Sequence, residues 1–139
     1  MIVLSIVGSS GSGKTSLLEK IVPKLAKLGF KVAVVKHAQS GFDVDVKGKD
    51  SHRLFNAGAD VAVVTDEKVA IFCRISLGRV LDFFRNYDFV LLEGFSKMDY
   101  PKIALDEREY ENVIFRYRGN PEEVVNFLLS LLKKPRGKT

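Results

Sequence analysis

The sequence predicts an α/β fold, a three-layer sandwich with a mostly parallel central sheet and helices on both faces. Stretches typical of strands alternate along the chain with stretches of helical periodicity. The range 30–36 contains VAVV, which is apolar on both faces, as in a strand that is covered on each side. The first strand, helix and strand follow one another closely enough to form a right-handed βαβ unit, which joins parallel strands.

The first helix is expected to continue through a proline. Residues 2–7 form the first strand, and apolar residues then repeat at helical spacing over 17–28, until Gly29 ends the pattern. Pro23 lacks the amide that would bond to the preceding turn. Because the apolar stripe continues beyond it, we expect a bend at Pro23 rather than a helix end.

The remaining elements continue the alternation. The sequence NPEE at 120–123 supplies a cap, a proline at the first helical position and a glutamate at the third, so it opens the last helix. Asp66-Glu67 is a tight turn between two strands. The expected ranges are a helix over 50–57, strands over 60–65 and 68–74, a helix over 77–85, strands over 88–93, 102–105 and 113–117, and a helix to 132.

Length and charge indicate one domain, residues 1–132, followed by a basic tail, residues 133–139. The chain has 139 residues and a formal net charge of +5. Four of the 22 basic residues lie in the tail, and the other 18 nearly balance the 17 acidic residues. A nucleic-acid-binding domain is expected to carry a basic stripe across its surface, so we do not expect nucleic-acid binding.

The single cysteine, Cys73, lies in an apolar run and has no partner for an internal disulfide. A reducing, cytoplasmic setting is therefore expected. The amino terminus lacks the features of a signal peptide, and no apolar run approaches the ~20 residues needed to span a bilayer. We expect no membrane association.

The stretch GSSGSGKT, at residues 8–15, matches the phosphate-binding pattern G-x-x-x-x-G-K-[ST] at every defined position, between a strand and a helix. Glycines let successive amides point at a phosphate, and the helix amino terminus adds partial positive charge. Lys14 would reach the β and γ phosphates, and the Thr15 hydroxyl would bind Mg²⁺. These features predict a P-loop NTPase-like protein that binds a nucleoside triphosphate. The predicted phosphate-binding residues are Gly8, Ser9, Ser10, Gly11, Ser12, Gly13, Lys14, Thr15 and Ser16.

A second metal-binding acid is expected at the end of another strand. In the stretch YDFVLLEGF, Asp88 and Glu93 flank one apolar core. If this strand runs parallel to the first, its carboxyl end lies beside Gly8, and Asp88 is then about 16 Å away at ~3.3 Å per residue. Glu93 is therefore the candidate for holding Mg²⁺ or orienting water, and Lys14 and Glu93 are the candidate catalytic residues.

The connection after the second strand is long and polar, and it begins at the same edge of the sheet. Lys36 and Lys49 are candidates for phosphate contacts. Asp43, Asp45 and Asp50 either meet metal, ribose or a second substrate, or are solvated loop residues, and Asp50 alternatively caps a helix.

Four blocks occur in the order and approximate spacing of the MobB family, the molybdopterin-guanine dinucleotide biosynthesis adaptors. The blocks are GSSGSGKTSLLEKIVPKL, VAVVKHAQ, DVKGKDSHRLFNAGA and LLEGFSKMDYPKI. The chain resembles this family over about residues 2–105. The resemblance implies a weakly hydrolysing homodimer that binds GTP and Mg²⁺ and assists the guanylyltransferase that joins GMP to molybdopterin. It also implies that Gly11 to Thr15 hold the phosphates and Mg²⁺ with Glu93, and that the neighbouring loops are lined by Lys36, His37, Asp45, Lys49, Asp50 and Lys102.

Two alternatives share the phosphate-binding loop. A small-molecule kinase would transfer the phosphate, and arginines such as Arg74, Arg79 and Arg85 would clamp it. A regulatory ATPase would use hydrolysis to switch partners. The sequence has no spare segment for a kinase lid and no obvious arginine finger, so we expect at most a slow GTPase.

Overall fold

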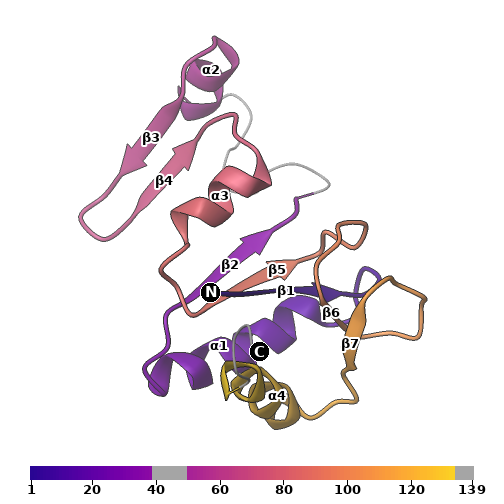
Figure 1. Ribbon diagram of the computed structural model, residues 1–139. Helices are drawn as coiled ribbons and strands as arrows, with labels where there is room; N and C mark the ends of the chain where they lie inside the picture. The colour runs from indigo at the N-terminus through magenta and orange to yellow at the C-terminus, as the bar shows by residue number, and fades with distance from the viewer. Residues whose placement is uncertain (39–49, 134–139) are drawn as a thin grey trace, which may run out of the picture. The chain divides into compact units, whose positions relative to one another are not determined.

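The computed structural model describes residues 1–38 and 50–133 of the chain. They form two compact units, one from the described parts of Met1–His37 and Phe83–Thr139, the other from Ala38–Asp82. The elements, labelled in Figure 1, are β1 (Ile2–Val7), α1 (Lys14–Lys27), β2 (Val32–Lys36), α2 (Asp50–Asn56), β3 (Val61–Val64), β4 (Val69–Phe72), α3 (Leu77–Phe83), β5 (Phe89–Glu93), β6 (Lys102–Ala104), β7 (Val113–Arg116) and α4 (Pro121–Lys133).

The first unit is built on a five-stranded sheet of order β2-β5-β1-β6-β7, in which every pair of neighbouring strands is parallel. Ile6 of β1 and Lys36 of β2 both lie opposite Glu93 of β5 in the register. The carboxyl ends of these three strands therefore meet at one edge. The predicted α/β class, with its mostly parallel sheet, is confirmed, and so is the parallel direction of the Glu93 strand.

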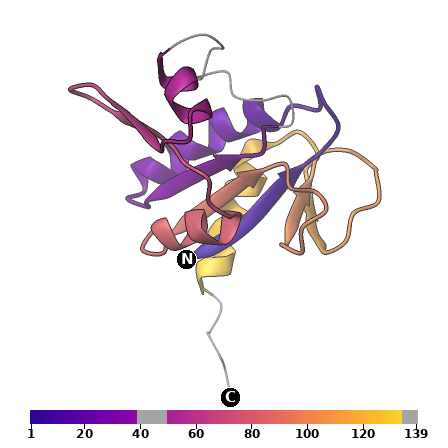
Figure 2. The same cartoon turned by 90° about the horizontal axis from the view of Figure 1, so that it is seen from above.

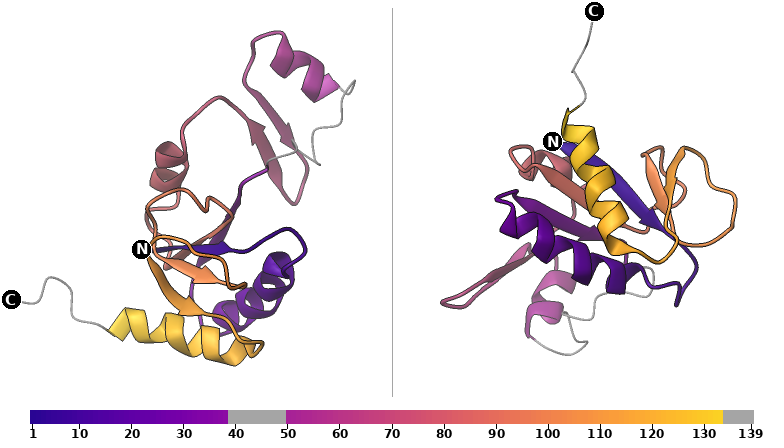
Figure 3. Two further views of the ribbon diagram at one scale, coloured as in Figure 1. Left: turned by 90° about the vertical axis from the view of Figure 1, so that its right-hand side faces the viewer. Right: turned by 90° about the horizontal axis from the view of Figure 1, so that it is seen from below.

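One face of this sheet is covered by α1 and α4. Figure 1 shows both helices on the same side of the strands, and the view from below in Figure 3 shows them side by side. Apolar side chains from the two helices and from alternate strand positions bury one another, which supplies most of the stabilising free energy of such a layer. The fully buried members are Leu4, Ile6, Leu17, Ile21, Leu25, Phe89, Leu91, Ile103, Val124 and Leu128.

The first helix begins earlier than its apolar pattern. It starts at Lys14 and continues through Pro23 to Lys27, so the expectation that it passes the proline is confirmed. The periodic apolar residues start only at Leu17 because that is where the helix first packs on the sheet. After the helix, Gly29 adopts a φ of +91°, which favours glycine and turns the chain toward β2.

The last helix begins as predicted. The Asn120 side-chain oxygen accepts a hydrogen bond from the Glu122 amide at 3.1 Å, and the Asn120 carbonyl accepts one from the Glu123 amide at the same distance. Asn120 thus caps the first turn of α4, which satisfies amides that have no partner inside the helix.

The opposite face of the sheet is also buried. In Figure 2 the strands of this sheet lie in front of α1 and α4. Ser5, Val90, Leu92 and Lys102 on this face are inaccessible to solvent. Because β5 is buried on both faces, its sequence FVLL is apolar without alternation.

The second unit contains α2 and an antiparallel hairpin of β3 and β4. The Thr65 amide donates to the Lys68 carbonyl at 2.9 Å, which closes the turn predicted at Asp66-Glu67. The Arg74 guanidinium lies over the Phe55 ring, 3.6 Å from its centroid, and donates to the Phe55 carbonyl at 2.8 Å.

Across both described ranges, 1–38 and 50–133, the helices fall short of the length and apolar character required to cross a membrane.

Candidate nucleotide-binding site

The loop between β1 and α1 is shaped by glycines with left-handed backbone angles. Gly11 has a φ of +80° and Gly13 a φ of +99°, a region that other residues rarely adopt. Gly13 is also the N-cap residue of α1, and among the described residues no side chain caps the helix there. The partial positive charge of the helix amino terminus therefore faces the loop, as an anion-binding loop requires.

Gly8 and Ser12 are in close contact across this loop. A Cβ atom at Gly8 would lie 2.3 Å from the Ser12 hydroxyl oxygen and 3.1 Å from the Ser12 Cβ, so a larger residue would displace the Ser12 side chain. The Ser12 hydroxyl is buried and, within the described part of the chain, has no hydrogen-bond partner. A buried hydroxyl is normally paired, and a phosphate oxygen is a suitable acceptor for it.

The Lys14 ammonium lies over the same loop. It donates hydrogen bonds to the Gly8 carbonyl at 2.8 Å and to the Ser9 carbonyl at 3.2 Å. A positive charge is thus held over the loop that is predicted to bind phosphate. Ser10 lies in the loop and Ser16 in the first turn of α1, both exposed.

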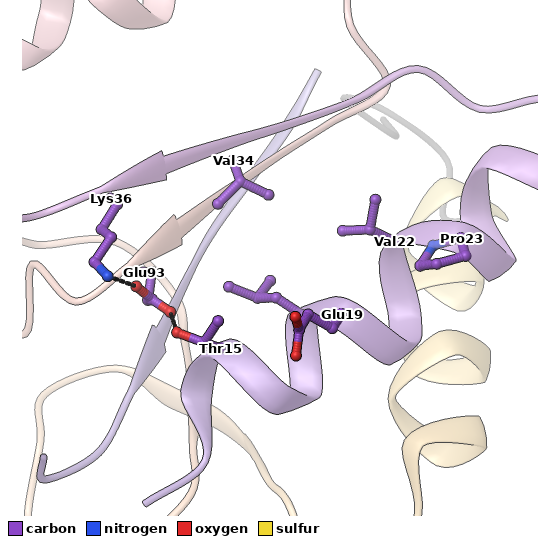
Figure 4. A pocket seen from close by; sticks show the side chains of 8 residues that line it. Thr15, Glu19, Val22, Pro23, Val34, Lys36 and Glu93 are labelled. Atoms are coloured by element: carbon purple, nitrogen blue, oxygen red, sulfur yellow. Dashed lines mark hydrogen bonds and ion pairs between the residues drawn. The ribbon is translucent and has the colours of Figure 1, made fainter. Parts of the chain in front are cut away.

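Three predicted site residues from three elements meet beside the loop (Figure 4). The Thr15 hydroxyl, on the first turn of α1, donates a hydrogen bond to one carboxylate oxygen of Glu93. The Lys36 ammonium, at the end of β2, lies 3.6 Å from the other oxygen. Glu93 is buried, whereas 61% of the Lys36 side chain is exposed. The structure therefore brings the two predicted metal ligands into direct contact.

The donor set fits a small hard cation. Mg²⁺ is usually held in proteins by one or two side-chain oxygens together with substrate phosphates and water. Thr15 and Glu93 supply such oxygens at the end of the glycine loop. Within residues 1–38 and 50–133, no three histidine, cysteine, aspartate or glutamate side chains lie close enough together to hold a metal ion by themselves. The residues present fit a nucleoside triphosphate with Mg²⁺ better than a free metal site.

Asp106, which no sequence motif predicts as a site residue, also contacts the loop. Its carboxylate accepts a hydrogen bond from the Ser9 amide at 2.8 Å. It also accepts bonds from the Tyr110 hydroxyl at 3.0 Å and the Arg108 amide at 3.3 Å. The sequence DEREY offers no motif that would reveal this contact, since Asp106 reaches the loop only because β6 lies beside β1.

The surroundings of Asp106 favour its ionised form. Burial alone would raise the pKa of the Asp106 carboxyl, but the hydrogen bonds from Ser9, Tyr110 and Arg108 outweigh this and lower the pKa. Burial and the neighbouring Asp106 carboxylate raise the pKa of the Tyr110 hydroxyl, so it remains a donor. Asp106 is thus a carboxylate that anchors the start of the glycine loop.

Two other predicted site residues make mainly internal contacts. The Lys102 side chain is fully buried, and its ammonium donates to the Met98 carbonyl at 2.6 Å and to the Tyr100 carbonyl at 3.0 Å. The His37 ring stacks on the Phe95 ring, with centroids 4.8 Å apart. Both residues therefore stabilise the segment that follows Glu93. A direct contact of either residue with a ligand stays a prediction.

The remaining predicted residues lie outside the described ranges or in the second unit. Asp45 and Lys49 lie outside the described residues, as does Asp43. Asp50 begins α2 in the second unit, where its carboxylate is 95% exposed and lies 3.9 Å from Arg53. The i,i+3 pair is a typical helix-surface ion pair.

A parallel sheet, a glycine loop at the end of its central strand and an acid at the end of the neighbouring strand define the P-loop NTPase-like class. The family model for molybdopterin guanine dinucleotide synthesis protein B, MobB, matches residues 3–126 of this chain. The chain belongs to the MobB family.

Curated relatives agree with this assignment. The molybdopterin-guanine dinucleotide biosynthesis adapter protein of Haemophilus influenzae is 40% identical over 114 residues, which cover 77% of this chain and 64% of that protein. The putative adapter protein of Methanocaldococcus jannaschii is 40% identical over 113 residues, which cover 76% of this chain and 47% of that protein. The matched part thus spans less than two thirds of the length of each relative.

Solved structures show the same fold. A crystal structure of molybdopterin-guanine biosynthesis protein B superposes with a TM-score of 0.68 and 31% identity, covering 96% of this chain and all of that one. The crystal structure of Bacillus subtilis MobB superposes with a TM-score of 0.70 and 25% identity, covering 94% and 97%. The fold predicted from the sequence is therefore that of the family.

Proposed function

We propose that this protein is a cytoplasmic GTP-binding accessory protein of molybdenum cofactor biosynthesis with weak Mg²⁺-dependent GTPase activity. The contact between Thr15 and Glu93 beside the glycine loop carries the proposal, because it pairs two oxygen donors where a triphosphate would end. The relatives named above are adapter proteins of molybdopterin-guanine dinucleotide biosynthesis. The choice of GTP over ATP rests on the resemblance to the MobB family and not on a particular residue of this chain.

The side chains of the site favour binding over rapid chemistry. Lys14 and the loop amides would hold the phosphates, and Glu93 would hold Mg²⁺ with Thr15 or orient a water molecule. Bound Mg²⁺ supplies charge neutralisation at the phosphates. An arginine finger can add 10³–10⁵ in rate. The guanidinium of Arg116 instead binds the backbone carbonyls of Asp106 and Arg108, and that of Arg118 pairs with Glu107.

Direct titration tests nucleotide binding. We expect GTP to bind more tightly than ATP in the presence of Mg²⁺. Lys14→Ala removes charge-assisted contacts to phosphate and is expected to weaken GTP binding by about ten- to a hundredfold. Lys20→Ala, on an exposed position of the same helix, is the matched control and is expected to bind as the wild type does. Equal affinity of the Lys14→Ala variant and the wild type would refute the site.

Phosphate release separates the proposal from a kinase. With Mg²⁺ and GTP we expect turnover well below the ~10 s⁻¹ typical of enzymes, and no stimulation by small-molecule acceptors. Fast, acceptor-dependent turnover would support the kinase instead. Faster turnover with ATP than with GTP would support a regulatory ATPase.

The β3–β4 hairpin supports a homodimer. Val64, Val69 and Ile71 of this hairpin are 67%, 56% and 64% exposed. An isolated two-stranded sheet is marginally stable in water, and large exposed apolar patches mark interaction surfaces. We propose that a second copy of the chain covers the hairpin.

Light scattering tests the dimer. The wild type is expected to have the mass of two chains, and Ile71→Lys is expected to shift it toward one chain. Ile114→Lys, at a half-exposed position of β7, is the control and should leave the mass unchanged.

The proposed partner is the guanylyltransferase of molybdenum cofactor synthesis. Co-purification of the tagged protein from its source cell, with partners identified by mass, tests that assignment.

A further inference from the structure

A pocket of about 520 Å³ extends from the candidate metal site along the groove between α1 and β2 (Figure 4). Its size suits a small molecule, since ligand pockets typically measure about 300–1,000 Å³. It extends beyond the candidate nucleotide site, because Leu18, Glu19, Val22, Pro23 and Val34 line the pocket alone. The lining residues are Thr15, Leu18, Glu19, Val22, Pro23, Val34, Lys36 and Glu93.

The pocket has one polar end and one apolar end. Thr15, Lys36 and Glu93 form the polar end, and Figure 4 shows Val34 of β2 facing Val22 and Pro23 of α1 along the rest of the groove. The groove is open because β2 is the edge strand of the sheet, and Val34 remains 44% exposed. Two apolar walls that face each other suit a flat ring between them.

Charged groups of both signs line the pocket. The Lys36 ammonium offers N–H donors to an anionic group at the polar end, beside the position predicted for Mg²⁺. The Glu19 carboxylate lies on the wall formed by α1 and is an acceptor for ring N–H or amino groups. A ligand that satisfies both carries a phosphate beside Lys36 and donor groups on a flat heterocycle beside Glu19.

We propose that this pocket binds a second substrate-like ligand, a flat N–H-bearing heterocycle with a phosphate monoester, next to the bound nucleotide. This inference rests on the proposed function. Molybdopterin-guanine dinucleotide synthesis brings a phosphorylated pterin and a guanine nucleotide together, so an accessory protein of that synthesis would bind both. Lys36 contacts the phosphate, Glu19 contacts the ring donors, and Val34 and Val22 enclose the ring.

The test is a calorimetric titration with a pair of probes, neopterin monophosphate and neopterin, which differ only in the phosphate. The protein is first saturated with Mg²⁺ and a non-hydrolysable GTP analogue, so the glycine loop is filled. We expect the phosphate ester to bind about tenfold more tightly than neopterin, the size of one charge-assisted hydrogen bond. In Lys36→Gln the two probes should bind equally.

Filling the groove tests its location. Val34→Trp and, from the opposite wall, Val22→Trp are expected to abolish probe binding while GTP-analogue affinity and the far-ultraviolet circular dichroism stay unchanged. Leu28→Trp, exposed at the end of α1 and outside the pocket, should bind the probe normally.

Three results would overturn the inference: no probe binding to the wild type, unchanged binding in both filled variants, or binding only when the GTP analogue is omitted. The last result would place the probe in the glycine loop. Because GTP binding is measured separately, failure of the pocket and failure of the proposed function are distinguishable.

Discussion

The Thr15 hydroxyl donates a hydrogen bond to the Glu93 carboxylate, although 78 residues separate them in the chain. The contact exists because β1 and β5 are parallel neighbours, which brings the start of α1 to the carboxyl end of β5. Lys36 reaches the same carboxylate from β2, the other neighbour of β5. Glu93 is therefore the residue at which the glycine loop and the groove beside it meet.

Glu93→Gln is expected to impair Mg²⁺-dependent GTP hydrolysis much more than Asp88→Asn does. The glutamine amide retains the shape of the side chain but lacks the negative charge that holds a cation. Asp88 lies at the other end of β5, where its carboxylate accepts a hydrogen bond from the Lys31 amide at 2.7 Å. Phosphate release measured against Mg²⁺ concentration, with GTP binding followed in parallel, checks the difference. Equal losses in the two variants would show that Glu93 has no special role.

The ionised Asp106 carboxylate is expected to stabilise the protein at neutral pH. Because its pKa is lowered from the ordinary 3.8, the contribution is complete above that value and is lost as the pH falls through the lowered pKa. Asp106→Asn should therefore lower the thermal midpoint at pH 7 and at pH 5 by the same amount.

As the pH falls below 3.8 and through the lowered pKa of Asp106, the midpoints of the wild type and Asp106→Asn should converge, since below that pKa both carry a neutral side chain. Thermal unfolding at several pH values between 7 and 3 measures this. Glu109→Gln, on the exposed part of the same loop, is the control. A difference between wild type and Asp106→Asn that stays constant down to pH 3 would mean that the charge of Asp106 does not act on stability.

Lys102→Ala is expected to destabilise the protein by roughly 2–4 kcal/mol, because it opens a cavity and leaves buried carbonyls without their donor. Lys102→Met fills most of the space and loses only the hydrogen bonds, so it should cost less, about 1–2 kcal/mol. Lys97→Ala, exposed in the same loop, should be neutral. Urea unfolding gives all three values. A Lys102→Met variant as stable as the wild type would show that the bonds to Met98 and Tyr100 contribute little.

Gly94→Ala should destabilise the protein more than Gly119→Ala. Both glycines have positive φ angles, +97° and +106°, so each substitution costs roughly 1 kcal/mol from the backbone. At Gly94 the new Cβ would also lie 3.2 Å from the Cβ of His37, whereas nothing lies within 4 Å at Gly119. Urea unfolding compares the two variants, and equal losses would mean that His37 moves aside without cost.

The local sequence was sufficient to predict most of the secondary structure and the glycine loop between the first strand and the first helix. Strand and helix periods are local properties, so the apolar stripe of α1, the cap at Asn120 and the turn at Asp66-Glu67 agree with the structure. The loop motif is local for the same reason, since its glycines need only a preceding strand and a following helix. The choice of Glu93 over Asp88 needed one further assumption, that the two strands are parallel, and the register confirms that assumption.

Contacts between distant segments depended on the tertiary structure. Asp106 contacts Ser9 because β6 lies beside β1, and no spacing in the sequence encodes that neighbour relation. The family resemblance implied that Lys102 lines a loop beside the nucleotide, and only the fold shows that its ammonium is buried and bonded to the Met98 and Tyr100 carbonyls. Local sequence determines which backbone conformations are favourable, whereas the order of strands in the sheet determines which side chains meet, because hydrogen bonding and burial act between residues that are close only after folding.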